Sequence, residues 1–145
     1  MSLDEKILIE KYHQFNKEYF NNEIKGYIVI NFHDMLFQNM LGCVNRTKTV
    51  SIWYKEIKII NIILLNNILR NIDISNDAMD TILVHEMIHL HLMDYKRKIK
   101  THGHIFRSEC RRIKKINPKL GLTYRDSTTI RKKLLPNYPY MEEVK

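Results

Sequence analysis

The chain is poor in cysteine and has no long uninterrupted apolar run. Its two cysteines, Cys43 and Cys110, lie far apart and form no CxxC pair, which excludes a disulfide framework and favours a reducing compartment. The most apolar run, residues 57–69, is interrupted by Lys58 and three asparagines and is too short to span a bilayer. The sequence also lacks the apolar core of a secretory signal. We therefore expect an intracellular protein, cytoplasmic or nuclear, with no membrane partner.

Acidic residues are outnumbered by basic ones. The 145 residues include 24 Lys and Arg against 16 Asp and Glu, a formal net charge of +8. This balance favours acidic partners such as nucleic acid, although a solvated lysine-rich surface would give the same count. With 44% hydrophobic and 28% charged residues, the composition is that of a globular protein. No repeat or low-complexity linker divides the sequence, so we expect one domain over residues 1–145.

The N-terminal half mixes helical and strand patterns. Apolar residues recur every three or four positions near the start, which predicts an amphipathic helix over about residues 3–22. Segments rich in β-branched and aromatic residues predict strands at 27–33 and 49–54. The segment 57–70 is apolar nearly all round and is predicted as a covered helix.

The C-terminal half predicts two further helices, so we expect an α+β fold. Residues 76–94 are apolar on almost every side, which is typical of a central buried helix, and Ser75 is a candidate N-cap. A second helix is predicted over about 103–116, ending at an Asn-Pro pair. A basic loop, 96–100, joins the two. The apolar stripe of the second helix comprises Phe106, Cys110 and Ile113.

Residues 81–94, TILVHEMIHLHLMD, place three titratable groups in the most apolar predicted helix. His85 and His89 are four residues apart and therefore share a helix face. Glu86 lies about 100° around the helix, where its carboxylate can act as a general base without ligating the metal. Two imidazoles on one zinc beside a general base is the chemistry of the HExxH motif. Because buried ionisable groups are costly unless paired or metal-bound, a zinc site explains all three more economically than a hydrogen-bonded core network.

A catalytic zinc needs a third protein ligand and one open position. Leu92 and Tyr95 exclude the metzincin spacing, which requires glycine and histidine at these positions. The residues alone leave three candidates for the third ligand, His102, His104 and Glu109. The remaining histidines, His13, His33 and His91, are predicted to have structural or surface roles.

The spacing of two motifs resembles the SprT-like, or Spartan-type, zinc metallopeptidase family. The family pattern is HExxH followed by HGxxF, and here HEMIH is followed by HGHIF. FNKEYFNNEI, LGCV, VSIW and INPKLGLTY resemble further family elements, so the resemblance covers about residues 12–124. It implies a zincin-like single domain, with a small twisted sheet packed on a central HExxH helix and further helices. The cysteine-rich zinc ribbon of many bacterial relatives has no counterpart in this sequence.

The resemblance also implies a site and an activity. His85, His89 and His102 would ligate one Zn²⁺ ion per chain, and Glu86 would be the catalytic base of a metalloprotease acting on proteins or peptides. Relatives are DNA-associated proteases, which implies DNA-associated proteins as substrates. We expect an extended peptide to add to the edge of the 49–54 strand, with Trp53 either lining the cleft or packing in the core.

Two alternatives remain. One is a basic DNA-binding module with little or no turnover, which the intact Glu86 disfavours. The other is a WLM-type HExxH peptidase, which Gly103 and Phe106 disfavour. We also expect weak, sequence-independent binding of single-stranded DNA. Its candidate contacts are Lys96, Arg97, Lys98, Lys100, Arg107, Arg111, Lys114 and Lys115.

Overall fold

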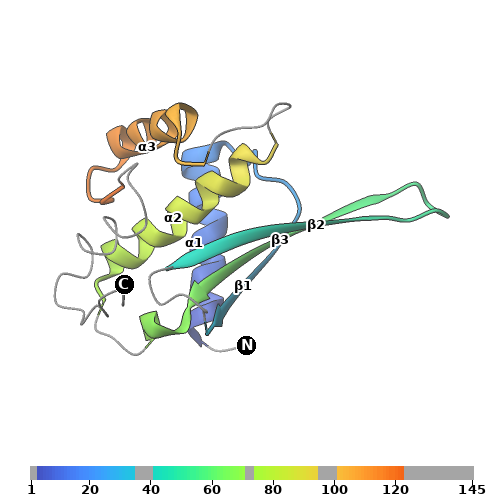
Figure 1. Ribbon diagram of the computed structural model, residues 1–145, viewed down its shortest axis with the longest axis horizontal. Coiled ribbons are helices and arrows are strands. Elements are labelled where there is room, and N and C mark those ends of the chain that lie inside the picture. Colours follow the sequence, from blue (N-terminus) through green and yellow to red (C-terminus); the bar gives the residue numbers. More distant parts are fainter. Residues whose placement is uncertain (1–2, 35–40, 71–73, 95–100, 123–145) are drawn as a thin grey trace, which may run out of the picture.

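The computed structural model describes residues 3–34, 41–70, 74–94 and 101–122, and shows an α+β fold (Figure 1). Its elements follow in the order α1 (Leu3–Phe20), β1 (Tyr27–His33), β2 (Gly42–Val50), β3 (Ile57–Asn66), the 3-10 helix η1 (Asn67–Arg70), α2 (Asn76–Leu92) and α3 (His104–Ile116). In these described ranges, no helix combines the length and hydropathy needed to cross a membrane.

The three strands form one sheet with β3 in the centre. The order is β1-β3-β2, with β1 parallel and β2 antiparallel to β3. Ile30 of β1 and Val44 of β2 both pair with Ile63 of β3. Ile30, Ile63 and Leu65 are at most 2% exposed, whereas their neighbours along each strand are more exposed. The sheet therefore turns one face to the helices and the other to solvent, as the period-2 alternation requires.

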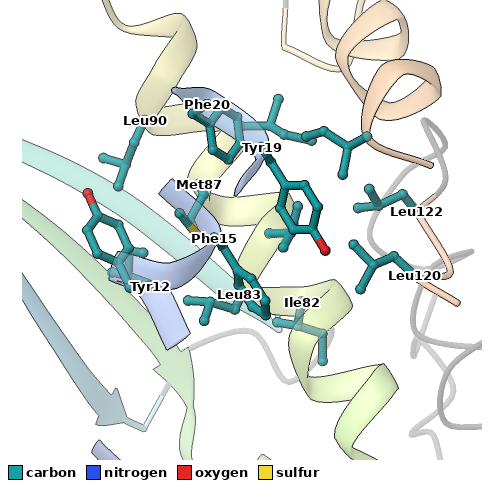
Figure 2. Close-up of a cluster of buried hydrophobic side chains, with 14 of the residues drawn as sticks. Tyr12, Phe15, Tyr19, Phe20, Ile82, Leu83, Met87, Leu90, Leu120 and Leu122 are labelled. Atoms are coloured by element: carbon teal, nitrogen blue, oxygen red, sulfur yellow. The ribbon is translucent and has the colours of Figure 1, made fainter. Parts of the chain in front are cut away.

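The core is built where α1 packs on α2. The predicted stripe of α1 is confirmed, and the helix ends at Phe20 because Asn21 and Asn22 adopt left-handed φ angles of 51° and 59°. Helix α2 begins where predicted, since the Ser75 hydroxyl accepts a hydrogen bond from Ala78 N at 3.1 Å. Figure 2 shows this cluster, to which α1, α2 and the segment after α3 contribute Tyr12, Phe15, Tyr19, Phe20, Ile82, Leu83, Met87, Leu90, Leu120 and Leu122.

The helix predicted over residues 57–70 is wrong. This segment forms strand β3 followed by η1. The segment is dominated by isoleucine, whose branched Cβ favours the extended backbone. It is also the central strand, paired on both sides. A strand whose inner face is buried and whose outer face is half-buried is apolar at nearly every position, and over a short run this pattern cannot be told from a buried helix.

The predicted strand 49–54 is also wrong in its bounds. The strand runs from Gly42 to Val50, and residues 52–54 form a turn that leads into β3. Ser51 closes this turn, because its N–H donates to Glu56 O at 2.9 Å and its hydroxyl accepts from Tyr54 N at 3.3 Å. Strands β2 and β3 thus form a hairpin that projects well beyond the rest of the protein (Figure 1).

A buried arginine fastens the end of α2 to the sheet. The side chain of Arg46, from β2, is 7% exposed. Its guanidinium donates to Asn61 Oδ1 at 2.7 Å, to Leu90 O at 3.2 Å and to the carboxylate of Asp94. Since Leu90 lies in the last turn of α2, this network satisfies a terminal helix carbonyl and fixes α2 relative to β2.

Candidate metal centre

Three histidine side chains converge where α2 meets the start of α3. His85 and His89 come from consecutive turns of α2, and His102 lies two residues before α3. The Nε2 atoms are 3.3 Å apart for His85 and His89, 3.1 Å for His89 and His102, and 3.3 Å for His102 and His85. The structure therefore brings His102 to the HExxH pair.

This spacing fits a small metal ion. Two nitrogens that each lie 2.0–2.1 Å from a tetrahedral zinc are about 3.3 Å apart, which matches all three separations. Within the described ranges, this is the one group of at least three His, Cys, Asp or Glu side chains whose candidate ligand atoms lie close enough for one ion, all within 4.8 Å of one another. The three imidazoles could therefore hold a single metal ion.

The surroundings keep the imidazoles of His85 and His89 neutral, which is the form that binds metals. Burial, together with the nearby rings of His89 and His102, lowers the pKa of His85 to about 3. Burial and the ring of His102 lower the pKa of His89 to about 4. At neutral pH, both side chains therefore keep a nitrogen lone pair available for a ligand bond.

Phe106 supports the three imidazole rings from behind. Its ring is fully buried, and its centroid lies 5.0 Å from the ring of His85, 4.7 Å from that of His89 and 4.8 Å from that of His102. The sequence places Phe106 only in the apolar stripe of the second predicted helix and in the HGxxF motif. The contacts give it a physical role, because a rigid aromatic ring touching all three imidazoles limits how far each can rotate.

The backbone at His102 adopts an uncommon conformation. Its φ angle is 55°, in the left-handed region that histidine enters more readily than most residues. The next residue, Gly103, is the N-cap of α3. The left-handed backbone at His102 redirects the chain into α3. The imidazole of His102 points back to His85 and His89. Such outliers persist where the surrounding structure holds them, often at functional sites.

Glu86 is buried between α2 and the start of β2. Its side chain packs on Gly42, where a Cβ atom would lie 3.0 Å from Glu86 Oε1 and 3.2 Å from its Cδ and Cγ. Glycine at the first position of β2 therefore leaves space for the carboxylate. Burial raises the pKa of Glu86 to about 8, although a cation in the histidine cluster would lower it again. The sequence gives no signal for this contact, because it joins segments that meet only in the folded protein.

The other candidate ligands lie outside this cluster. His104 is exposed at the start of α3, and Glu109 forms an ion pair with Arg112 at 2.6 Å. His91 packs against the ring of Phe20 at 5.2 Å, a structural role as predicted. His13 and His33 are exposed.

The described residues include only some of the predicted DNA and substrate contacts. Arg107, Arg111, Lys114 and Lys115 are exposed on α3, whereas Lys96, Arg97, Lys98 and Lys100 lie outside the described residues. Trp53 is 90% exposed in the hairpin turn, which excludes the alternative that it packs in the core.

Comparison with protein families gives one match. The model of the SprT-like family matches residues 8–128, which is most of the chain and includes every residue of the histidine cluster. Neither the curated proteins nor the solved structures gave a match.

We expect the purified protein to bind one divalent ion per chain, and His85→Ala, His89→Ala and His102→Ala each to lower this content sharply. Metal analysis after dialysis against trace zinc measures it. His104→Ala is the matched control, because this exposed histidine lies two residues from His102 but outside the cluster. The assignment is wrong if His104→Ala loses the ion or if His102→Ala retains it.

Proposed function

The chain belongs to the SprT-like family, and on that premise we propose that it is a zinc-dependent metallopeptidase with a zincin-like arrangement around α2. The observation that carries this proposal is the convergence of three imidazoles whose Nε2 atoms lie within 3.3 Å of one another, one residue from the buried carboxyl of Glu86. A peptide bond is a suitable target for this combination, since its hydrolysis requires both carbonyl polarisation and proton transfer.

In this proposal, His85, His89 and His102 hold the zinc ion, and Glu86 moves the proton. When bound, zinc supplies Lewis acidity toward water and the substrate carbonyl. Glu86 accepts a proton from the attacking water and returns it to the amide nitrogen as the C–N bond breaks. Burial raises the pKa of Glu86 and a bound cation would lower it. A pKa between these two influences suits both steps, because the carboxyl must take up and release a proton near neutral pH.

The number of ligands favours catalysis over a purely structural ion. A structural zinc is usually enclosed by four protein ligands, whereas a catalytic one keeps a position open. Among the described residues, three histidines form the cluster and no fourth His, Cys, Asp or Glu joins it. Glu86 is adjacent to this cluster, and a structural site would have no use for a buried general base there. The family match separates this chain from the WLM-type alternative.

The outer edge of β2 offers a docking surface for an extended peptide. Asn66 N donates to Leu41 O, and Ser51 N donates to Glu56 O, both at 2.9 Å, so the odd-numbered residues of β2 face β3. By the alternation of antiparallel pairing, the even-numbered residues direct their backbone N–H and C=O groups to the opposite edge. Among the described strands, β2 pairs with β3 alone. A peptide added at this edge would pass Gly42, beside Glu86.

The surface of α3 supports association with DNA as a further part of the proposal. Arg107, Arg111, Lys114 and Lys115 are exposed, and at 100° per residue they fall on one side of the helix. Because α3 begins two residues after His102, a phosphate backbone bound there would run close to the metal centre. A peptidase tethered to DNA in this way would meet DNA-associated proteins as substrates.

Glu86→Gln separates metal binding from catalysis. The amide cannot accept the proton of the attacking water, so we expect peptide hydrolysis to fall at least a hundredfold, as is typical for loss of a general base, with zinc content still near one per chain. Cleavage of a fluorogenic protein such as labelled casein measures the activity, and metal analysis measures the zinc. Hydrolysis at the wild-type rate would exclude the role proposed for Glu86.

Gly42→Ala tests the fit between β2 and the general base. The added methyl group would lie 3.0 Å from Glu86 Oε1, so the carboxyl must shift by several tenths of an ångström. We expect kcat to fall roughly ten- to a hundredfold, the penalty typical of a misplaced catalytic group, while zinc content stays at one. An unchanged kcat would mean that the position of Glu86 does not depend on this strand.

Charge reversal on α3 tests DNA binding. We expect the triple variant Arg107→Glu, Arg111→Glu and Lys115→Glu to weaken binding of single-stranded DNA and to lower the salt slope by about two, since each lost phosphate contact removes about 0.7. Fluorescence anisotropy across a salt series measures both. The control, with exposed Lys6, Lys17 and Lys25 changed to Glu, alters the net charge equally. Equal loss in both variants would show that overall charge, and not α3, governs binding.

A further inference from the structure

The tip of the β2–β3 hairpin exposes an unusual concentration of large apolar side chains. The exposed fractions are 90% for Ile52 and Trp53, 83% for Tyr54, 64% for Val50 and 62% for Ile57. All five residues lie within eight positions of the sequence, at the end of the arm that projects from the protein (Figure 1). A group of exposed apolar side chains of this kind marks an interaction site, because its exposure to water is unfavourable.

The fold does not require these side chains. The turn is closed by backbone and hydroxyl hydrogen bonds of Ser51, which any solvent-exposed polar residues at positions 52 and 53 would allow. Surface turns are ordinarily built from Gly, Asn, Asp, Ser and Pro. An Ile-Trp-Tyr sequence at a hairpin tip therefore calls for an explanation outside the folding of this chain.

The outer edge of β2, which no described strand pairs, connects this tip to the metal centre. Gly42, at one end of the strand, packs on Glu86, and Val50, at the other end, begins the tip. The eight residue steps between them span about 26 Å at roughly 3.3 Å per residue. A polypeptide lying extended along this edge past Glu86 would thus reach the tip after about eight of its own residues.

We propose that the hairpin tip is an exosite that binds apolar side chains of an extended substrate polypeptide. Antiparallel addition is the more stable pairing, and it places these side chains about eight to ten residues N-terminal to the bond that is cleaved. The inference depends on the proposed peptidase function and deepens it. The substrate class is unfolded or loosely folded protein with an apolar segment upstream of the cleaved bond.

Polypeptide is the occupant that the composition of the tip favours. Lys48, Lys55 and Lys58 flank it and would attract a nucleic acid, but nucleic acid is held by stacking on aromatic faces. Val50, Ile52 and Ile57 have no such face, whereas they suit aliphatic and aromatic side chains of an unfolded chain. Continuity with the outer edge of β2, which no described strand pairs, points the same way, since backbone groups along that edge can pair with a polypeptide.

The chain carries its own probe of the tip, because Trp53 is its only tryptophan. The experiment uses the zinc-loaded Glu86→Gln protein, which prevents turnover, and peptides without tryptophan that share one core sequence. One peptide carries a Leu-Phe-Ile cluster eight to ten residues N-terminal to the core bond, one carries serines there, and one carries the cluster on the C-terminal side. We expect only the first to shift the Trp53 emission to shorter wavelength, as burial of the indole would.

The same peptides test the consequence for cleavage by the active protein. We expect kcat/KM for the N-terminal cluster peptide to exceed that for the serine peptide by about tenfold. The double variant Ile52→Ser and Trp53→Ser should abolish this preference and leave cleavage of the short core unchanged. The matched control is Tyr27→Ser with Ile116→Ser, which removes two exposed apolar side chains outside the hairpin tip and should retain the preference.

Each alternative has a distinct outcome. Cleavage without a preference for the N-terminal cluster, or a preference that survives in the tip variant, overturns the exosite. A Trp53 shift with single-stranded DNA and none with the cluster peptide assigns the tip to nucleic acid, and a shift that grows with protein concentration alone assigns it to a second copy of the chain. If the short core is not cleaved by the zinc-loaded protein, the peptidase proposal fails, and the Trp53 emission still decides whether the tip binds the apolar segment.

Discussion

The burial of α2 on nearly every side is the constraint on which the rest of the structure depends. Leu83, Val84, Met87, Ile88 and Leu90 are all fully buried, so the helix has to be enclosed by α1, the sheet and α3 together. Polar side chains on such a helix are placed where an unpaired buried polar group is costly. The Nε2 atom of His85 is met by those of His89 and His102, and the glycine at the start of β2 leaves the space that the side chain of Glu86 occupies.

The parts of the fold that could be predicted from the sequence are those governed by local signals. The stripe of α1, the Ser75 cap of α2 and the Asn117 end of α3 each depend on residues within a few positions of one another. Strand β3 could not be separated from a helix, because an isoleucine-rich run paired on both sides has no distinguishing period. The true bounds of β2 were hidden because Ile52, Trp53 and Tyr54 have high strand propensity but lie in a turn.

In the candidate site, too, some residues could be recognised from local sequence spacing and others only from the folded structure. His85, Glu86 and His89 could be assigned from spacing alone, since four residues make one helical turn. His102 was one of three possibilities until the family resemblance was considered, and His104 and Glu109 were set aside only by the folded geometry. The contacts of Phe106 with three imidazoles and of Gly42 with Glu86 could not be anticipated, because they join segments that are far apart in the sequence. The hydrogen bonds of Arg46 that link β2 to α2 could not be anticipated for the same reason.

The position of His102 two residues before α3 has a thermodynamic consequence. The third nitrogen of the cluster and the basic surface of α3 belong to one short stretch of chain, so any displacement of that helix also moves one corner of the metal triangle. Reciprocity of binding free energies then requires that a ligand which favours one placement of α3 changes the affinity for the ion by the same factor as the ion changes the affinity for the ligand. An ion held by the three imidazoles and an anion bound to the surface of α3 would therefore be coupled through this short stretch of chain.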